Sequence, residues 1–259
     1  MGCSSLKTIN LSNNAIRIGA GAFKDCTSLD RITIPNKVTE IGSEAFLGCS
    51  SLKTISLSNN ITKIFDRTFK KCISLEAITI PDSVTNIGNE AFANCGKLKT
   101  INIPSNVINL GSNVFCWCSS LEEVHIPNGV KTLGKSAFCY CVALKSVVLP
   151  NYISSIESET FYKCSSLKSV TIPHRVTKIG ATAFGHCSSL EEITIPSSIE
   201  EIGDSPFWNV GKVQRLIFTG TKKEWSIIKR AMGIKAKEYD FVGLTQREMK
   251  EIKKLFNIK

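Results

Sequence analysis

The sequence repeats itself every 23 residues over most of its length, and this period limits the chain to folds built from stacked, equivalent units. The cysteines show the period without a slip. Nine of the eleven form one series at this spacing: Cys3, Cys26, Cys49, Cys72, Cys95, Cys118, Cys141, Cys164 and Cys187. Phenylalanine recurs at the same interval from Phe23 to Phe207. Because nothing is inserted between units, each residue type forms a column along the axis of a solenoid.

One unit is predicted to be a short strand followed by turns. The segment 29–34 alternates apolar and polar residues, which indicates a strand with one buried face. Pro35 ends the strand because it has no N–H for a further ladder bond. The three-residue step from Phe46 to Cys49 indicates a tight turn that points both side chains inward. No unit can bury its apolar face alone, so the units are stable only when stacked.

Glycine and alanine occupy two further columns. We expect Gly42 and its equivalents to let the chain turn, and Ala45 and its equivalents to let neighbouring units approach closely. Two units carry larger residues at these positions: Phe65 and Thr68 in one, Glu157 and Thr160 in the other. We expect local distortion of those two turns.

These columns closely resemble the recurring text of the BspA-like, or Treponema-type, leucine-rich-repeat family. One copy reads Ile172-Pro173-x-x-Val176-Thr177-x-Ile179-Gly180-x-x-Ala183-Phe184-x-x-Cys187-Ser188-Ser189-Leu190. The resemblance covers roughly residues 1–220. It implies a curved, mostly β, leucine-rich-repeat solenoid, here of about ten coils, with a parallel concave sheet. It also implies protein binding without catalysis or cofactor, often attachment to host surfaces, by proteins that are secreted or displayed at the cell surface.

The C-terminal part of the chain differs from the repeats. Residues 212–259 hold 13 Lys and Arg against 5 Asp and Glu, whereas the rest of the chain holds 19 against 17. Capping-box sequences at 221–224 and 245–248 predict two helices, the first ending near Met232. We expect residues 221–259 to cap the open apolar end of a solenoid of residues 1–220. The alternative is that the Lys-rich face contacts a polyanion or an acidic membrane.

The sequence begins in the middle of a repeat, and its first residues lack the charged start and apolar stretch of a signal peptide. We expect either a fragment or a first coil that a partner covers. No run of residues reaches the ~18 apolar positions that a membrane-spanning helix needs.

Cys116 and Cys139 stand outside the cysteine series. They directly follow Phe115 and Phe138, so we expect them to point outward on adjacent coils. A surface disulfide between them, or two free thiols, is favoured over a metal site, because ligands for a metal must converge. The nine cysteines of the series are predicted to be buried free thiols that pack as small apolar groups.

Aromatic residues gather beside these two thiols, on the turns of the later coils. The candidate binding residues are Trp117, Tyr140, Tyr162, His186 and Trp208, together with Cys116 and Cys139. Earlier coils hold Lys24, Asp25, Gly48, Lys70, Lys71 and Asn94 at these positions. Clustered exposed aromatic residues are typical of an interface. The alternative is that the rings only cover the turn.

The outward face of the predicted strands is a second candidate surface. Its candidate residues are Arg31, Thr54, Thr100, Glu123, His125, Thr171 and Glu192. Small hydroxyl side chains dominate these columns, and they supply few of the aromatic anchors that concentrate binding energy.

The sequence shows no catalytic group with the partners that it would need. Glu123 and His125 share a face, but neither a nucleophile nor a phosphate-binding Gly-rich loop accompanies them. We therefore predict a non-catalytic protein–protein interaction module of the adhesion or host-interaction type, with no cofactor and no metal. The alternative is an intracellular binding or inhibitor protein that docks one macromolecular partner, which the many thiols favour. Weak polyanion contact through the tail is a third possibility.

Overall fold

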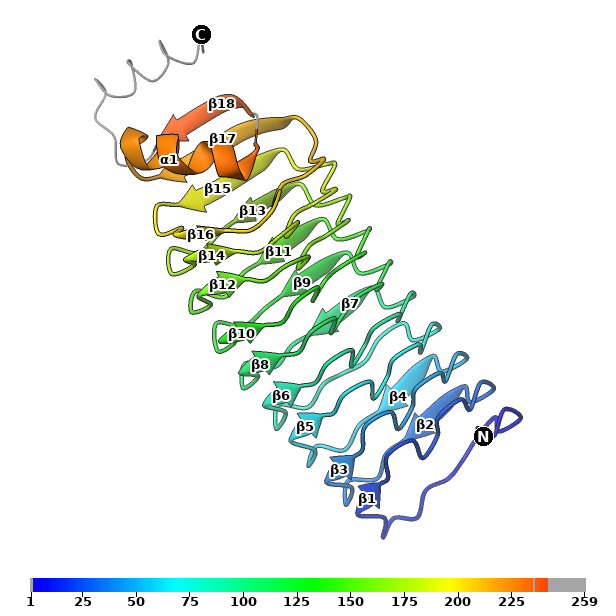
Figure 1. The fold of residues 1–259 in the computed structure, drawn as a ribbon. Coiled ribbons are helices and arrows are strands. Elements are labelled where there is room, and N and C mark those ends of the chain that lie inside the picture. Colours follow the sequence, from blue (N-terminus) through cyan, green and yellow to red (C-terminus); the bar gives the residue numbers. More distant parts are fainter. Residues whose placement is uncertain (1, 235, 242–259) are drawn as a thin grey trace.

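The chain folds into a parallel β-solenoid of about nine turns with almost no helix, as a computed structural model shows (Figure 1). The structure describes residues 2–234 and 236–241. Each coil contributes short strands to two faces, and strands pair with those 23 residues further on: Ile32 with Ile55, and Ile18 with Ile41. This register confirms the leucine-rich-repeat fold predicted from the period.

The first face carries three-residue strands that lengthen toward the C-terminus. They are β2 (Arg31–Thr33), β4 (Thr54–Ser56), β7 (Thr100–Asn102), β9 (Glu123–His125), β11 (Ser146–Val148), β13 (Ser169–Thr171), β15 (Glu192–Pro196) and β17 (Val213–Thr219). Their central residues are buried and the flanking ones point outward, as the alternating pattern predicts.

The second face carries two-residue strands. They are β1 (Arg17–Ile18), β3 (Glu40–Ile41), β5 (Lys63–Ile64), β6 (Asn86–Ile87), β8 (Asn109–Leu110), β10 (Thr132–Leu133), β12 (Ser155–Ile156), β14 (Lys178–Ile179) and β16 (Glu201–Ile202).

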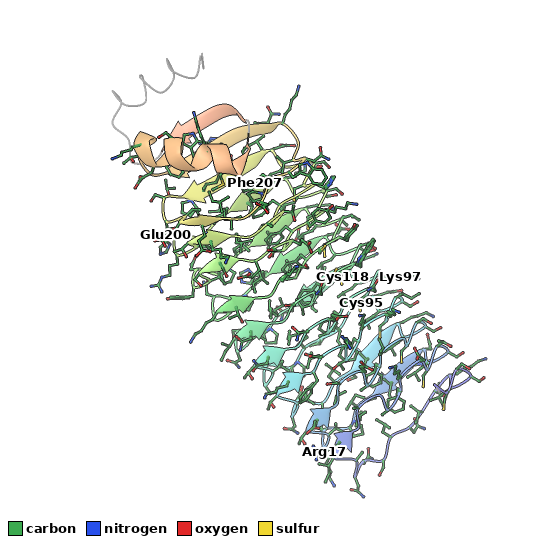
Figure 2. All side chains as sticks on the ribbon, in the orientation of Figure 1. Arg17, Cys95, Lys97, Cys118, Glu200 and Phe207 are labelled. Atoms are coloured by element: carbon green, nitrogen blue, oxygen red, sulfur yellow. The ribbon has the colours of Figure 1, made fainter. Side chains whose placement is uncertain are left out.

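The interior consists of stacked columns of identical residues. The phenylalanine rings from Phe23 to Phe207 stack nearly parallel, with centroids 5.0–5.6 Å apart. From Cys49 to Cys187, each cysteine of the series points its thiol at the carbonyl oxygen of the phenylalanine one coil earlier, 3.0–3.3 Å away. Cys95 and Cys118 lie on neighbouring coils in Figure 2. All these thiols are free, and only Cys3 is exposed among the nine, so the other eight are the buried apolar fillers that we predict.

The glycine column serves close approach rather than turning. Gly42 does not adopt a positive φ; a Cβ there would lie 2.6 Å from the backbone nitrogen of Ala20 on the preceding coil. At Gly134 and Gly180 the same contact would measure 2.4 and 2.3 Å. Our expectation that these glycines let the chain turn is therefore wrong. They are required because any side chain would strike a backbone.

The turning is done by two other positions in each coil, which hold left-handed backbone conformations. Most are not glycine, for example Glu44 (φ 58°) and Asn94 (φ 63°). Such conformations cost an L-residue roughly 1–2 kcal/mol. They persist because the surrounding inter-coil hydrogen bonds fix the backbone.

Both sheets are interrupted where the glycine is replaced, at Phe65 and Glu157. On the second face, strand pairing stops between β3 and β5 and again between β10 and β12. On the first face it stops beyond β4 and between β11 and β13. Within these two turns, the hydroxyl of Thr68 donates to the carbonyl of Phe65 at 2.8 Å, and that of Thr160 donates to the carbonyl of Glu157 at 2.7 Å. The two turns keep the left-handed conformation of the other coils, at Arg67 (φ 57°) and Glu159 (φ 59°), so the disturbance lies in the strand pairing and not in the turns, where we expect it.

The C-terminal part adds a helix and a strand. Helix α1 (Lys222–Met232) begins at the predicted capping box of Thr221 and Glu224, and its Trp225 packs on Phe218. Strand β18 (Ala236–Phe241) then pairs with β17 in parallel. We expect a helical cap from the sequence, and this strand shows that the cap is only partly helical. The predicted second helix, at 245 and beyond, lies outside the described residues.

Candidate functional site

The turns that follow each core phenylalanine form a ridge along the solenoid. Each turn has two positions directly after the phenylalanine. The first, directly after the phenylalanine, holds Lys24, Leu47, Lys70, Ala93, Cys116, Cys139, Tyr162, Gly185 and Trp208. The second, which is left-handed, holds Asp25, Gly48, Lys71, Asn94, Trp117, Tyr140, Lys163, His186 and Asn209.

A backbone ladder holds this ridge together. The N–H of each second position from Asp25 to His186 donates to the carbonyl of the first position on the next coil, at 2.7–2.8 Å. The ladder runs without interruption past both coils at which the sheets break. The side chains of the ridge are therefore held at the constant spacing of the coils.

The five predicted aromatic residues form one continuous row on this ridge, which we call the aromatic row: Trp117, Tyr140, Tyr162, His186 and Trp208. Trp117 stacks on Tyr140 with centroids 3.8 Å apart and an angle of 11°. The next three pairs meet edge to face, at 5.8, 5.4 and 4.6 Å. Trp117 and Trp208, at the two ends, are 47% and 54% exposed. The structure thus brings together the residues that the sequence grouped.

Two polar residues join the row that sequence reasoning did not select. The ammonium group of Lys163 lies 4.8 Å from the centre of the Tyr140 ring, and its hydrogen bond to Tyr140 raises the pKa of this lysine. The side-chain amide of Asn209 lies 2.9 Å from Nδ1 of His186. Both occupy the second turn position, in the same column as Trp117, Tyr140 and His186. The repeat register therefore could have identified them from the sequence.

Small residues at the first turn position make room for the rings. A Cβ on Gly185 would lie 3.0 Å from Cδ2 of Tyr162. Cys116 and Cys139 occupy the same column beside Tyr140 and Tyr162. A pattern of small residues next to large ones therefore builds the aromatic row.

Cys116 and Cys139 are not on the surface, contrary to our expectation. They are only 9% and 6% exposed and form a small apolar cluster with Ala93, separate from the main core and partly covered by Tyr140 and Tyr162. Both are free thiols. The Cys139 thiol donates a hydrogen bond to the Cys116 sulfur, which lowers the pKa of Cys116 and raises that of Cys139.

The early part of the ridge is charged instead of aromatic. Glu44 pairs with Lys24 at 2.8 Å and with Arg67 at 3.3 Å, and Arg67 reaches Glu90 at 3.3 Å. Lys70 also contacts Glu90. These pairs are open to solvent, so each contributes little to the stability of the fold.

The residues predicted on the first face point outward from the strands, as expected. Arg31, Thr54, Thr100, Glu123, His125 and Thr171 are exposed, and Glu192 is half-buried. A hollow of about 620 Å³ includes Arg31. Glu192 pairs with Arg215 at 3.3 Å, and Lys145 pairs with Glu122 at 2.6 Å. Neighbouring strands thus balance charge, which supports a structural role for this face.

Within the described part of the chain, no group of three or more His, Cys, Asp or Glu side chains is placed to hold a metal. No described helix has the length and apolar character needed to cross a bilayer.

The stacked coils and exposed ridge define a leucine-rich-repeat solenoid, a fold of the protein-interaction class. The family model for the BspA type leucine rich repeat region (6 copies) matches residues 1–122 and 108–227, so the chain belongs to this family. Such families are generally non-catalytic repeat scaffolds.

Several solved structures are similar. A leucine rich repeat protein of T. pallidum is 30% identical, over 68% of this chain and 71% of that one, with a TM-score of 0.50. A leucine rich cell surface protein of Faecalibacterium prausnitzii is 27% identical over 83% of this chain and 79% of that one, with a TM-score of 0.49. The pneumococcal vaccine antigen PcpA shares the fold at 20% identity, over 88% and 71%, with a TM-score of 0.53. No curated protein matches.

Proposed function

We propose that this chain is an adhesion-type module that binds a protein partner through the aromatic row. One observation carries the proposal: five aromatic side chains follow one another on the ridge at positions where the fold does not require them. The early coils fill the equivalent positions with Lys71 and Asn94 and stack equally well. The rings are therefore not needed to cover the turn.

The backbone adds a second argument. Trp117, Tyr140 and His186 have φ of 64°, 61° and 61°. Glycine and asparagine adopt this conformation most readily, whereas a bulky residue there costs of order 1–3 kcal/mol. Large aromatic side chains thus occupy strained positions while remaining partly open to solvent. Lys71 and Lys163 hold the same conformation on their coils, so the repeat sets this strain, and the large aromatic side chains are what the later coils add to it.

The chemistry of the row defines its partner. Trp and Tyr are the residues that most often concentrate binding energy in interfaces, because they bury a large rigid area. Lys163, beside Tyr140, adds a positive charge to the centre of the row. We infer a protein partner that presents an apolar segment with an acidic residue next to it.

The test is a double variant with a matched control. Trp117→Ser with Tyr140→Ser removes the stacked pair, whereas Lys71→Ser with Asn94→Ser changes the same turn position on two earlier coils. Binding of each purified protein to an array of extracellular-matrix and cell-surface proteins is measured by surface plasmon resonance. We expect any partner of the unaltered chain to lose at least about tenfold in affinity with the first variant, since a lost anchor costs about 2 kcal/mol, and to bind the control unchanged. Equal binding by both variants would refute the proposal.

The proposal includes display at the cell surface, which membership in this family supports. Protease treatment of intact source cells, followed by immunodetection, tests this separately. We expect the protein to be digested without lysis; protection until lysis would favour the intracellular alternative. A polyanion-binding role predicts instead that binding falls steeply as salt increases.

A further inference from the structure

Cys116 and Cys139 occupy a setting unlike that of the other buried cysteines. They sit at the first turn position of adjacent coils, where the N–H of Trp117 donates to the carbonyl of Cys139 at 2.8 Å. Parallel backbones joined in this way lie ~4.8 Å apart. This spacing falls inside the Cα separation of 4.4–6.8 Å that a disulfide allows. The two side chains lie with Ala93 in one small apolar cluster, against which Tyr140 and Tyr162 pack.

The cysteine series provides an internal comparison, because its members have the same coil spacing. The thiols of Cys118 and Cys141 are fully buried in the main core, and each is directed at a phenylalanine carbonyl. Their sulfurs are thus engaged and out of reach of a reagent. The outer pair lies instead in a separate small cluster, against which two tyrosine side chains pack that are themselves partly exposed.

We propose that Cys116 and Cys139 are a reversible redox pair that closes to an intrachain disulfide in the presence of a low-molecular-weight disulfide. The Cys116 thiolate attacks one sulfur of the reagent and expels the first small thiol, which leaves a mixed disulfide on Cys116. Cys139 then loses its proton to solvent and attacks the Cys116 sulfur, and the second small thiol leaves. Two protein thiols are oxidised and one small disulfide is reduced to two thiols.

Two structural features support this order of events and its reversibility. The hydrogen bond from Cys139 favours the thiolate of Cys116, which is the reactive form. In-register side chains that point the same way do not reach ideal disulfide geometry, and strained disulfides are the readily reduced ones. The cross-link joins two successive coils beside Tyr140 and Tyr162. The pair reacts whether or not the aromatic row binds a partner.

The experiment treats the reduced full-length chain with oxidised glutathione at pH 8, blocks the remaining thiols with iodoacetamide and measures the intact mass. Trypsin then separates the two cysteines, because residues 100–131 carry Cys116 and residues 136–145 carry Cys139. We expect the loss of two hydrogens and one cross-linked pair of these peptides, with fragmentation placing the bond at Cys116 and Cys139. Dithiothreitol should restore both thiols.

Two variants locate the reaction. Cys139→Ser should stop at the mixed disulfide and retain glutathione on Cys116. Cys141→Ser, two residues away in the same peptide, should still form the cross-link. A stable glutathione adduct on Cys116 in the unaltered chain, a bond between cysteines of the series, or no reaction of Cys116 would each overturn the proposal.

Discussion

Replacing Gly134 by alanine should separate two coils without unfolding the chain. The new Cβ would lie 2.4 Å from the backbone nitrogen of Ser112 and 2.5 Å from the carbonyl carbon of Gly111. Because both contacts are backbone atoms, no side chain can move aside. The N–H of Gly134 must then give up its bond to the Leu110 carbonyl, now 3.0 Å, and the short pairing of β8 with β10 is strained.

The magnitude follows from the bonds at stake. Loss of the Gly134 bond and of one neighbouring ladder bond costs about 1 kcal/mol each, and loosened packing adds about 1 kcal/mol. Alanine offsets roughly 0.4–1 kcal/mol of this loss, because it lowers the conformational entropy of the unfolded chain. The net loss is about 2 kcal/mol, which lowers Tm by about 4–8 °C for a domain of this size.

Urea titration and hydrogen exchange monitored by mass spectrometry would measure both the global and the local effect. Gly96→Ala is the matched control, since a Cβ there meets only the Ser119 hydroxyl, at 3.6 Å. We expect Gly96→Ala to leave stability unchanged or slightly raised. Equal stability of the two variants, or unchanged exchange around Leu110 and Gly134, would refute the close-approach argument.

Three further outcomes follow from the same packing. Phe115→Ala, in a ring that stacks at 5.6 Å on Phe92 and 5.3 Å on Phe138, should lose about 3–5 kcal/mol in urea unfolding. Burial raises the pKa of the eight buried cysteines of the series, and at Cys49 and Cys187 it raises the pKa to about 12. Above the ordinary thiol pKa the unfolded chain therefore releases protons that the folded chain retains. The free energy of unfolding, measured by urea titration in reducing buffer, should thus hold steady below pH 8. It should fall as the pH rises past 9, by up to about 1.4 kcal/mol per pH unit for each thiol; a flat profile to pH 10.5 would contradict this. Glu157→Gly combined with Thr160→Ala should restore pairing between β10 and β12 and slow amide exchange there, and unchanged exchange would show that these residues do not cause the interruption.

The fold could be predicted from the sequence because its period leaves few choices. Phenylalanine and cysteine columns 23 residues apart indicate stacked coils, and the structure buries both. The role of the glycine column could not be inferred in the same way. Residue type suggested a turn at Gly42, whereas the left-handed positions are held by residues such as Glu44, whose backbone is fixed by bonds to the next coil.

The candidate site was predicted in part. The register grouped the rings of the aromatic row, because residues in one column must be neighbours on the ridge. It did not predict the burial of Cys116 and Cys139, because that depends on the directions taken by Tyr140 and Tyr162 across two columns. Strand β18 was missed for a related reason: its pairing partner β17 supplies the stability, so no strong local pattern is needed.

The interruptions of the sheets bear on how the ridge works. At Glu157 the pairing fails on both faces, between β10 and β12 and between β11 and β13, yet the N–H of Tyr140 still donates to the carbonyl of Tyr162 at 2.8 Å. The ridge ladder therefore continues across the interruption, as do other backbone bonds between these coils, for example from the N–H of Lys168 to the carbonyl of Lys145 at 3.2 Å. Because Tyr140 and Tyr162 belong to the aromatic row, the row crosses the junction at its centre. A partner that binds all five rings would thus contact coils on both sides of the interruption.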